Sequence, residues 1–271
     1  MTAAQPAPPH VVDLTVERVA VCGDWHGDLS WVRALAQAIR AIAPDVTTIL
    51  QLGDWWMDLA ESDRIFMDAG IERVYVTLGN HERWGEITPL LDAHPGEAVR
   101  VSQVTWLLPR PARLRLGGRE FVSLGGAASL DEEWRYPGRD WWPDEAITDQ
   151  HIADAIAGGP ADVMLTHESP ARTPVAEVQR VLRSNPIGFP DSALIKSAAS
   201  RVRVAEVWDA VRPSLLLHGH MHVAGTGITD DGRQVTSLAS NGRQGHFAIL
   251  DLPTLTLETP ALGPGGTPIT S

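Results

Sequence analysis

Five apolar runs, each followed by residues of metal-ligating types, constrain the fold of this chain more than any other feature. The runs are residues 16–22, 46–52, 71–78, 162–166 and 215–217. Each is typical of a buried strand. The polar side chains that follow them are Asp24, His26, Asp54, Asn80, His167, His220 and His222. Because ligand sites in open α/β sheets lie beyond the carboxyl ends of the strands, we expect these side chains to meet at one edge.

The segments between the first runs predict helices. Residues 28–43 place apolar side chains on one helical face, with Asp28 or Ser30 as the candidate cap, and residues 57–69 can form a second helix. A succession of strand, polar loop, helix and strand is typical of right-handed βαβ units. The sequence therefore predicts an α/β fold with a parallel or mixed sheet.

The rest of the chain predicts shorter strands and two more helices. Gly117 and Gly118 are typical of a hairpin turn between strands at residues 112–116 and 120–124. Helices are expected at residues 147–157 and 192–211, and further strands at residues 99–101, 105–108, 235–238 and 247–252. We expect the last two of these strands to close the fold in antiparallel pairing.

Length and composition predict one folded domain. The chain has 271 residues, of which 44% are hydrophobic and 21% charged, which is ordinary for a soluble globular protein. Residues 1–10 and 260–271 are rich in Pro, Gly, Ala and Thr, so we expect flexible tails there. The predicted domain is residues 11–259.

Charge and cysteine content narrow the partners and the compartment. The net charge of -12 argues against binding of extended nucleic acid, which needs a surplus of Lys and Arg, but a small phosphorylated ligand remains compatible with it. Cys22 is the only cysteine, so no intrachain disulfide forms. We found no secretion signal and no apolar run near the roughly 20 residues of a membrane helix. These features predict a soluble, cytoplasmic protein without a membrane partner.

The residue types after the five runs suit divalent transition metals. Carboxylate, amide and imidazole donors together favour Mn, Fe, Zn, Ni or similar ions. A carboxylate can bridge two cations held about 3.5–4 Å apart, the spacing that clamps the attacking and leaving oxygens in phosphoryl transfer. The sequence therefore predicts a site for two divalent metal ions.

The motif order closely resembles that of the calcineurin-like metallophosphoesterase superfamily. The resemblance extends from about residue 17 to about residue 251. It rests on Asp24-Trp25-His26, Gly53-Asp54, Gly79-Asn80-His81-Glu82, His167 and Gly219-His220-Met221-His222. It implies an αββα sandwich of two mixed β-sheets flanked by helices, and an enzyme that hydrolyses phosphate esters.

The resemblance also implies a role for each residue. Asp24, His26 and His222 would bind the first metal ion, and Asn80, His167 and His220 the second. Asp54 would bridge the two ions, and a water or hydroxide held between them would attack phosphorus in line. His81 would be the catalytic residue that is not a ligand, protonating the leaving oxygen or stabilising its charge. Glu82 and Asp28 are candidates for orienting the imidazoles.

The substrate is less constrained than the chemistry. Related Ser/Thr protein phosphatases and diadenosine tetraphosphatases carry an Arg after the second motif, whereas this chain has Trp55 and Trp56 there. Arg83, Arg135 and Arg139 are candidate substitutes. We expect a small phosphomonoester or phosphodiester, with a nucleotide as one option. The alternatives are a nuclease or nucleic-acid end-processing phosphatase, and a binding module without activity.

Single residues also have simpler explanations. An Asp after Gly is more often a turn or cap residue, and His218 and His246 are weak candidates for contact with the site. Cys22 is expected to be buried. The tryptophans near the motifs could stack on a substrate, but we favour a structural role because seven exceed what one small ligand contacts.

Overall fold

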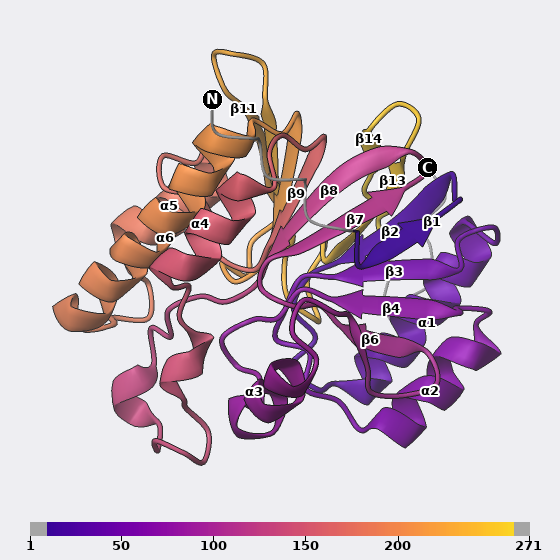
Figure 1. Cartoon of the computed structure of the whole chain (residues 1–271), viewed down its shortest axis with the longest axis horizontal. Coiled ribbons are helices and arrows are strands. Elements are labelled where there is room, and N and C mark those ends of the chain that lie inside the picture. Colours follow the sequence, from indigo (N-terminus) through magenta and orange to yellow (C-terminus); the bar gives the residue numbers. More distant parts are fainter. Residues whose placement is uncertain (1–9, 263–271) are drawn as a thin grey trace, which may run out of the picture.

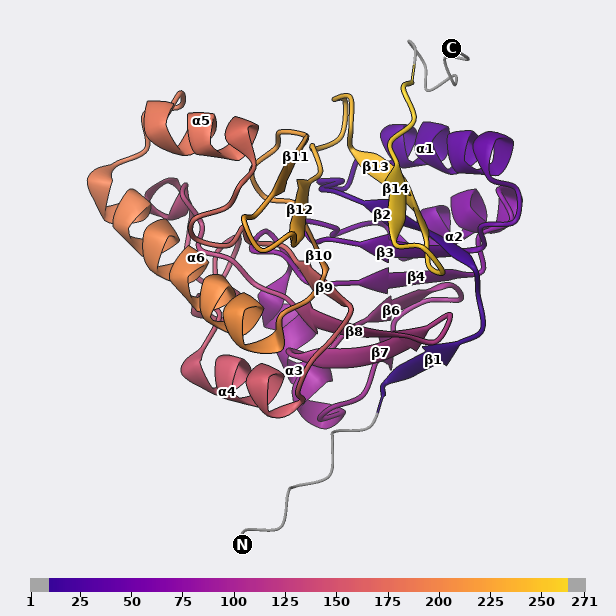
Figure 2. The same cartoon turned by 90° about the horizontal axis from the view of Figure 1, so that it is seen from above.

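Two β-sheets packed face to face, with helices on both outer faces, form the molecule (Figures 1 and 2). The computed structural model describes residues 10–262. This αββα arrangement is the one that the family resemblance implies, and it confirms the α/β fold predicted from the sequence pattern. The expected tails at residues 1–10 and 260–271 lie almost entirely outside the described residues. Leu262, the last described residue, is buried against the core.

The first sheet has the strand order β14-β13-β2-β3-β4-β6-β5. Its centre is parallel, because β2 pairs with β3, β3 with β4 and β4 with β6 in the same direction. The remaining strands, β5, β13 and β14, pair in antiparallel fashion. The bounds are β2 Arg18–Cys22, β3 Thr48–Gln51, β4 Arg73–Val76, β5 Val99–Arg100, β6 Thr105–Leu107, β13 Phe247–Asp251 and β14 Thr256–Glu258.

The second sheet has the strand order β1-β7-β8-β9-β10-β12-β11. Strands β8, β9, β10 and β12 run parallel to one another. Gly117 and Gly118 form the expected hairpin turn between β7 and β8, both with positive φ. The bounds are β1 Val12–Leu14, β7 Ala112–Leu116, β8 Arg119–Leu124, β9 Val163–Thr166, β10 Leu215–His218, β11 Gly225–Ile228 and β12 Gln234–Ser237.

Helices cover the outer face of each sheet. Side chains of α1 and α2 join the apolar cluster on the first sheet, and those of α4, α5 and α6 join the cluster on the second. Asp28 caps α1 as predicted, since its Oδ1 accepts a hydrogen bond of 3.0 Å from the Trp31 amide. The bounds are α1 Leu29–Ile42, α2 Leu59–Asp68, α3 Trp84–Ala93, α4 Asp149–Ala157, α5 Ala176–Ser184 and α6 Asp191–Val211.

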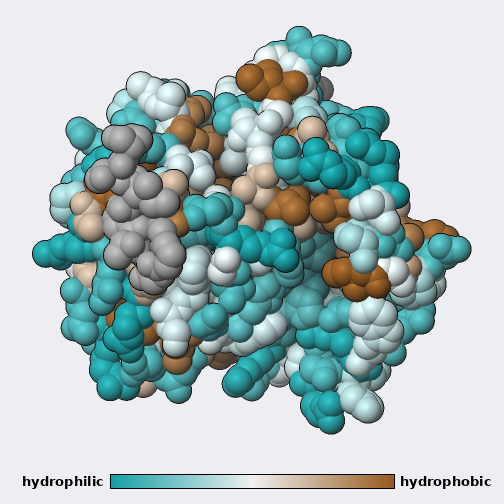
Figure 3. Space-filling model, turned by 180° about the vertical axis from the view of Figure 1, so that it is seen from behind, coloured by the Kyte–Doolittle hydropathy of each residue, from teal (hydrophilic) through white to brown (hydrophobic). Residues whose placement is uncertain are grey.

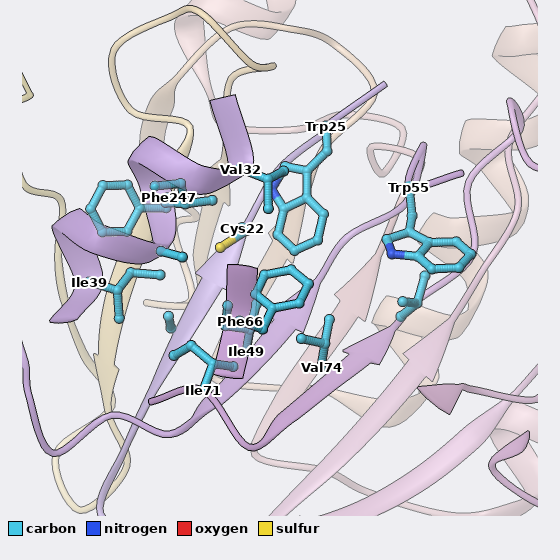
Figure 4. Close-up of a cluster of buried hydrophobic side chains, with 14 of the residues drawn as sticks. Cys22, Trp25, Val32, Ile39, Ile49, Trp55, Phe66, Ile71, Val74 and Phe247 are labelled. Carbon is cyan, nitrogen blue, oxygen red and sulfur yellow. The ribbon is translucent and has the colours of Figure 1, made fainter. Parts of the chain in front are cut away.

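Alternation along each strand divides the core into layers. Val19 and Val21 point between the two sheets, whereas Ala20 and Cys22 point towards α1 and α2. Figure 4 shows Cys22 within this helix-covered cluster, close to Trp25 and Phe66. Cys22 is fully buried, and burial raises the pKa of its thiol. The predicted structural role of this cysteine is therefore consistent with its position.

Three strands and two helices were not expected from the sequence. They are β1, β11, β14, α3 and α5. The strands are short and α3 contains Pro89, so their periodic signals are weak. Helix α5 is short and mostly polar, although its apolar residues do share one face. The missed β11 has a further consequence. Strand β12 pairs in antiparallel fashion with β11 but in parallel with β10. It is therefore not the purely antiparallel closing strand that we expected.

On the face shown in Figure 3, hydrophilic residues dominate and apolar residues form small patches. Among residues 10–262, no helix combines the length and the apolarity of a membrane span.

Candidate metal centre

The seven expected ligand residues lie together where the carboxyl ends of parallel strands from both sheets meet. The first sheet contributes the residues after β2, β3 and β4, and the second sheet those after β9 and β10. The resulting side chains are Asp24, His26, Asp54, Asn80, His167, His220 and His222. The site therefore bridges the two sheets, which explains how groups nearly 200 residues apart in the chain become neighbours.

One half of the site is a tight cluster of two carboxylates and two imidazoles. Asp24, His26, Asp54 and His222 each offer a ligand atom, and these atoms lie within 4.8 Å of one another. His222 Nε2 is 3.0 Å from Asp24 Oδ2, and His26 Nε2 is 3.5 Å from Asp54 Oδ2. Such a donor set suits a divalent cation.

The other half of the site is built around His167. Its Nε2 lies 3.0 Å from Asn80 Oδ1 and 3.3 Å from Asp54 Oδ1. The rings of His167 and His220 are 4.9 Å apart between centroids. Asp54 thus directs one oxygen to each half of the site. Its Oδ2 is buried without a hydrogen-bond partner among the described residues, as a ligand atom for a cation would be.

Four of these residues adopt a backbone conformation that is uncommon outside glycine. The φ angles are 48° at His26, 54° at Asp54, 63° at His220 and 55° at His222. Left-handed backbone costs free energy for residues with a Cβ and persists where surrounding structure holds it. Strain concentrated on four of seven neighbouring polar residues is typical of a functional site.

The glycines before these residues act mainly by leaving room. A Cβ on Gly79 would lie 2.4 Å from Asp54 Oδ1, and one on Gly219 would lie 2.2 Å from Asp24 Oδ1. Neither Gly79 nor Gly219 has a positive φ, whereas Gly53 does, at 99°. At Gly79 and Gly219 the requirement is close approach between backbone and carboxylate.

Electrostatics hold the site as a set of coupled charges. Burial alone would raise the pKa of Asp54, but the His167 and His81 imidazoles lower it well below its ordinary value. Burial opposes protonation of His26 and His167 as well, yet Asp54 raises their pKa values to about 9 and about 10. A cation entering the site would displace these protons.

Hydrogen bonds from outside the site orient several donors. His167 Nδ1 donates to the Leu52 carbonyl at 2.6 Å, which leaves Nε2 facing the site. Asn80 Nδ2 donates to Ser129 Oγ at 3.0 Å, and Ser129 donates in turn to Glu145 Oε2 at 2.8 Å. The amide oxygen of Asn80 is therefore held towards His167.

His26 is oriented through Asn241, a residue that sequence reasoning missed. Asn241 Oδ1 accepts a 2.9 Å hydrogen bond from His26 Nδ1, while its Nδ2 donates to Asp28 Oδ2 at 3.2 Å. Asp28 thus supports an imidazole as proposed, but indirectly. Glu82 does not orient an imidazole. Its carboxylate accepts hydrogen bonds from backbone amides of Trp55, Trp56 and Gly79.

Asn241 and Arg243 were missed because of the direction assigned to β12. They follow β12, and a strand parallel to β10 ends at the same edge as β10. The polar turn after the run at residues 235–238 was the available signal. Ser129 carried no such signal, because it lies in the irregular segment at residues 125–145 (Figure 1, lower left).

His81 lies beside the donors without joining the cluster. Its backbone amide donates to Asp54 Oδ1 at 2.9 Å, and its Nε2 is 3.8 Å from Asp131 Oδ1. Burial lowers the pKa of His81, the charge of Asp54 opposes this, and Arg135 reinforces it. His81 lines the same cavity as Asp54 and Asn80, so it can contact a molecule bound there.

The arginines, histidines and tryptophans that the sequence offered as further candidates differ in how close they lie to the site. None of the three candidate arginines lines this cavity. Arg135 is near His81, with its Nε 3.6 Å from Asp131, whereas Arg83 and Arg139 are exposed. His218 and His246 are buried and donate to backbone carbonyls.

Most tryptophans near the motifs pack in the protein. Trp25, Trp55 and Trp84 are buried, and Trp134 lines the cavity.

Comparison with known proteins decides the family. The family model for calcineurin-like phosphoesterases matches residues 17–224. The chain belongs to this family. No curated protein sequence is significantly similar to it.

Among solved structures, TT1561 of Thermus thermophilus superimposes with a TM-score of 0.55 at 15% identity, covering 90% of this chain and 98% of that one. A dimetal phosphatase from Danio rerio gives a TM-score of 0.47 at 14% identity, covering 88% of this chain and 93% of that one. The first likeness shows that the calcineurin-like phosphoesterase fold is shared over nearly the full length of both chains. Family membership and the donor cluster together indicate a metal-dependent phosphoester hydrolase.

Proposed function

We propose that this phosphoesterase hydrolyses a small phosphomonoester or phosphodiester at a centre of two divalent cations. Asp24, His26 and His222 would hold one cation, and Asn80, His167 and His220 the other. Asp54 would bridge them, and this residue carries the proposal. Its two oxygens face the two donor groups, at 3.5 Å from His26 and 3.3 Å from His167.

The metal ions and the side chains would contribute different chemistry. Bound divalent cations supply Lewis acidity towards the phosphoryl group and lower the pKa of a coordinated water. The residues of this chain supply position. Asn241 fixes the His26 ring, and Ser129 fixes the Asn80 amide, so the donors are set before any ligand arrives.

His81 is the proposed catalytic residue. It lines the cavity beside Asp54 and Asn80, so its imidazole can reach an oxygen leaving phosphorus. A neutral imidazole still carries one N–H, which can donate a hydrogen bond to the developing negative charge. Asp131, 3.8 Å from His81 Nε2, would favour the protonated form that also transfers a proton.

The test is metal reconstitution followed by turnover of two reporter esters. The stripped protein is loaded with Mn, Ni, Zn, Fe or Mg and assayed on p-nitrophenyl phosphate and bis-p-nitrophenyl phosphate. We expect turnover that requires metal, with two bound ions per chain. Relative rates on the two esters distinguish a monoesterase from a diesterase.

The same assay separates the alternative functions. Faster cleavage of a short single-stranded oligonucleotide than of either reporter would favour a nuclease or end-processing phosphatase. Two bound ions without turnover of any ester would favour a binding module. The net charge of -12 argues against the nucleic-acid alternative.

The expectations for domain organisation and for cellular location remain predictions. We propose that residues 11–259 act as one domain, because both sheets contribute ligands to one site. We also propose a cytoplasmic location, which rests on the single buried cysteine, Cys22.

A further inference from the structure

The lining of the cavity beside the metal centre combines two chemically different groups of residues. The cavity has a volume of about 620 Å³, within the range of pockets that bind small organic molecules. One group consists of Asp54, Asn80 and His81 together with the imidazoles of the second sheet. Most of the other lining residues are apolar. We call five of these the apolar wall, which we define as Leu130, Trp134, Val181, Ile187 and Phe189.

The apolar wall is assembled from two loops that hold each other in place. Trp134 belongs to the segment at residues 125–145, and Phe189 to the turn between α5 and α6. Their rings stack at 5.3 Å between centroids with an interplanar angle of 27°. Polar contacts join the segment at residues 125–145 to the first turns of α6, which follow this turn, since Ser192 Oγ donates to Glu133 and Lys196 Nζ to Glu132, each at 2.6 Å.

The turn that carries the wall is also fixed internally. Asn185, with φ 41°, ends α5, and its side-chain amide donates to the Phe189 carbonyl at 2.9 Å and accepts from the Phe189 amide at 3.0 Å. These two hydrogen bonds hold the backbone of Phe189, and with it the position of its ring, before any ligand binds. The wall is therefore a preformed surface, which lowers the entropic cost of binding.

Two residues of the wall are unusually exposed for their size. Trp134 is 58% exposed and Ile187 is 66% exposed, and both line the cavity that contains the catalytic candidates. Apolar side chains exposed together next to a polar site mark a binding surface more often than scattered ones do. A ligand that covered them would gain the free energy of apolar burial.

Polar groups that could recognise a sugar or a base are scarce on this cavity. Apart from the proposed ligands and His81, the polar lining residues are Asp131 and Arg243. Asp131 already faces His81 and Arg135. Arg243 forms no ion pair with any residue in the range 10–262, and it lies on the side of His222. Sugar hydroxyls and the polar edges of a base would lose hydrogen bonds to water without replacement if they were placed against the apolar wall.

We propose that the organic group of the substrate is apolar, an aryl or alkyl chain, and that it packs on the apolar wall. This inference rests on the proposed function, because it places the phosphate at the donor cluster. The Arg243 guanidinium then lies near the phosphate and offsets the negative charge that the metal ions leave on it. Nucleotides are poor substrates under this proposal, since their ribose and base would face the wall.

Binding of non-hydrolysable phosphonates tests the wall independently of catalysis. The metal-loaded protein is titrated with ethyl-, butyl-, hexyl- and octylphosphonate by calorimetry, and with 1-naphthylmethylphosphonate and adenosine monophosphate. We expect Kd to fall by about fourfold for each methylene that enters the cavity. The naphthyl and octyl arms distinguish an aromatic from an aliphatic organic group.

A matched pair of variants ties the effect to the wall. Ile187→Asn should reduce the octyl-to-ethyl affinity ratio by about tenfold, because it replaces apolar surface that the chain covers. Ile228→Asn is the control, since Ile228 is equally exposed at 66% but lies on β11, outside the cavity lining. It should leave the ratio unchanged.

The outcomes separate this inference from the proposed function. Affinity that does not change with chain length, or adenosine monophosphate binding more tightly than octylphosphonate, would overturn the apolar wall as a subsite. A chain-length effect equal in Ile187→Asn and wild type would do the same. A clear chain-length effect without ester hydrolysis would instead support the wall while refuting the catalytic proposal.

Discussion

At the scale of single residues, His81 and four of the proposed metal ligands line one cavity but should respond differently to mutation. His81→Ala should lower kcat by about 10²–10⁴-fold, the usual range for loss of a general acid, while leaving metal content intact. Kinetics and elemental analysis on the same preparation measure both. His94→Ala, an exposed histidine after α3, is the control. Loss of metal from His81→Ala would mean that His81 is a ligand.

Asp54 is the residue through which the two halves of the site are linked. Asp54→Asn keeps the shape and suits the left-handed backbone at φ 54°, so folding should persist. It removes the negative charge shared by both cations, so both should bind more weakly at once. Metal titration with Asp68→Asn, an exposed carboxylate at the end of α2, as control would show this. Displacement of one ion alone would contradict bridging.

At the scale of elements, the junctions between strands and loops determine whether the site forms. Gly79→Ala would place a Cβ 2.4 Å from both the amide nitrogen and Oδ1 of Asp54. We expect metal affinity to fall at least about tenfold because Asp54 must move. Gly96→Ala is the control. It strains a positive φ of 75° but meets nothing within 4 Å, so stability should fall modestly and metal affinity should not.

Strand direction is the element-scale property that limited sequence reasoning. The runs that became β2, β3, β4, β9 and β10 were recognised because each is apolar and ends in a conspicuous polar residue. Strand β11 contains two glycines, and its residues alternate between half-buried and exposed. Its sequence therefore gives little indication of a strand. Because β11 was missed, the direction of β12 relative to β10 was predicted wrongly. Asn241 and Arg243 were overlooked for that reason, although their residue types suit the site.

At the scale of the whole molecule, buried neutral histidines make stability depend on pH. Burial lowers the pKa of His246 to about 4, opposed by its hydrogen bond to the Arg243 carbonyl. The unfolded chain titrates near 6.5, so between about pH 6.5 and 4 it binds more protons than the folded chain. The free energy of unfolding should therefore fall as pH is lowered through this window.

Urea unfolding at pH 7 and pH 5 measures this dependence. His246→Gln should show a smaller loss between the two pH values than wild type, whatever its stability at pH 7. His26 and His167, whose raised pKa values change stability mainly above pH 6.5, contribute equally to wild type and variant and therefore cancel in the comparison. An unchanged pH dependence in the variant would show that His246 is not kept neutral by the fold.

The sequence by itself determined the fold class and which seven residues are proposed as metal donors. Both follow from local signals, since strand runs are apolar and the donors stand directly at their ends. Tertiary structure decided what surrounds them. The contacts of Asn241 with His26, of Ser129 with Asn80 and of Trp134 with Phe189 join segments distant in the chain. No periodicity reports such pairs, because they depend on which strand lies beside which and in what direction.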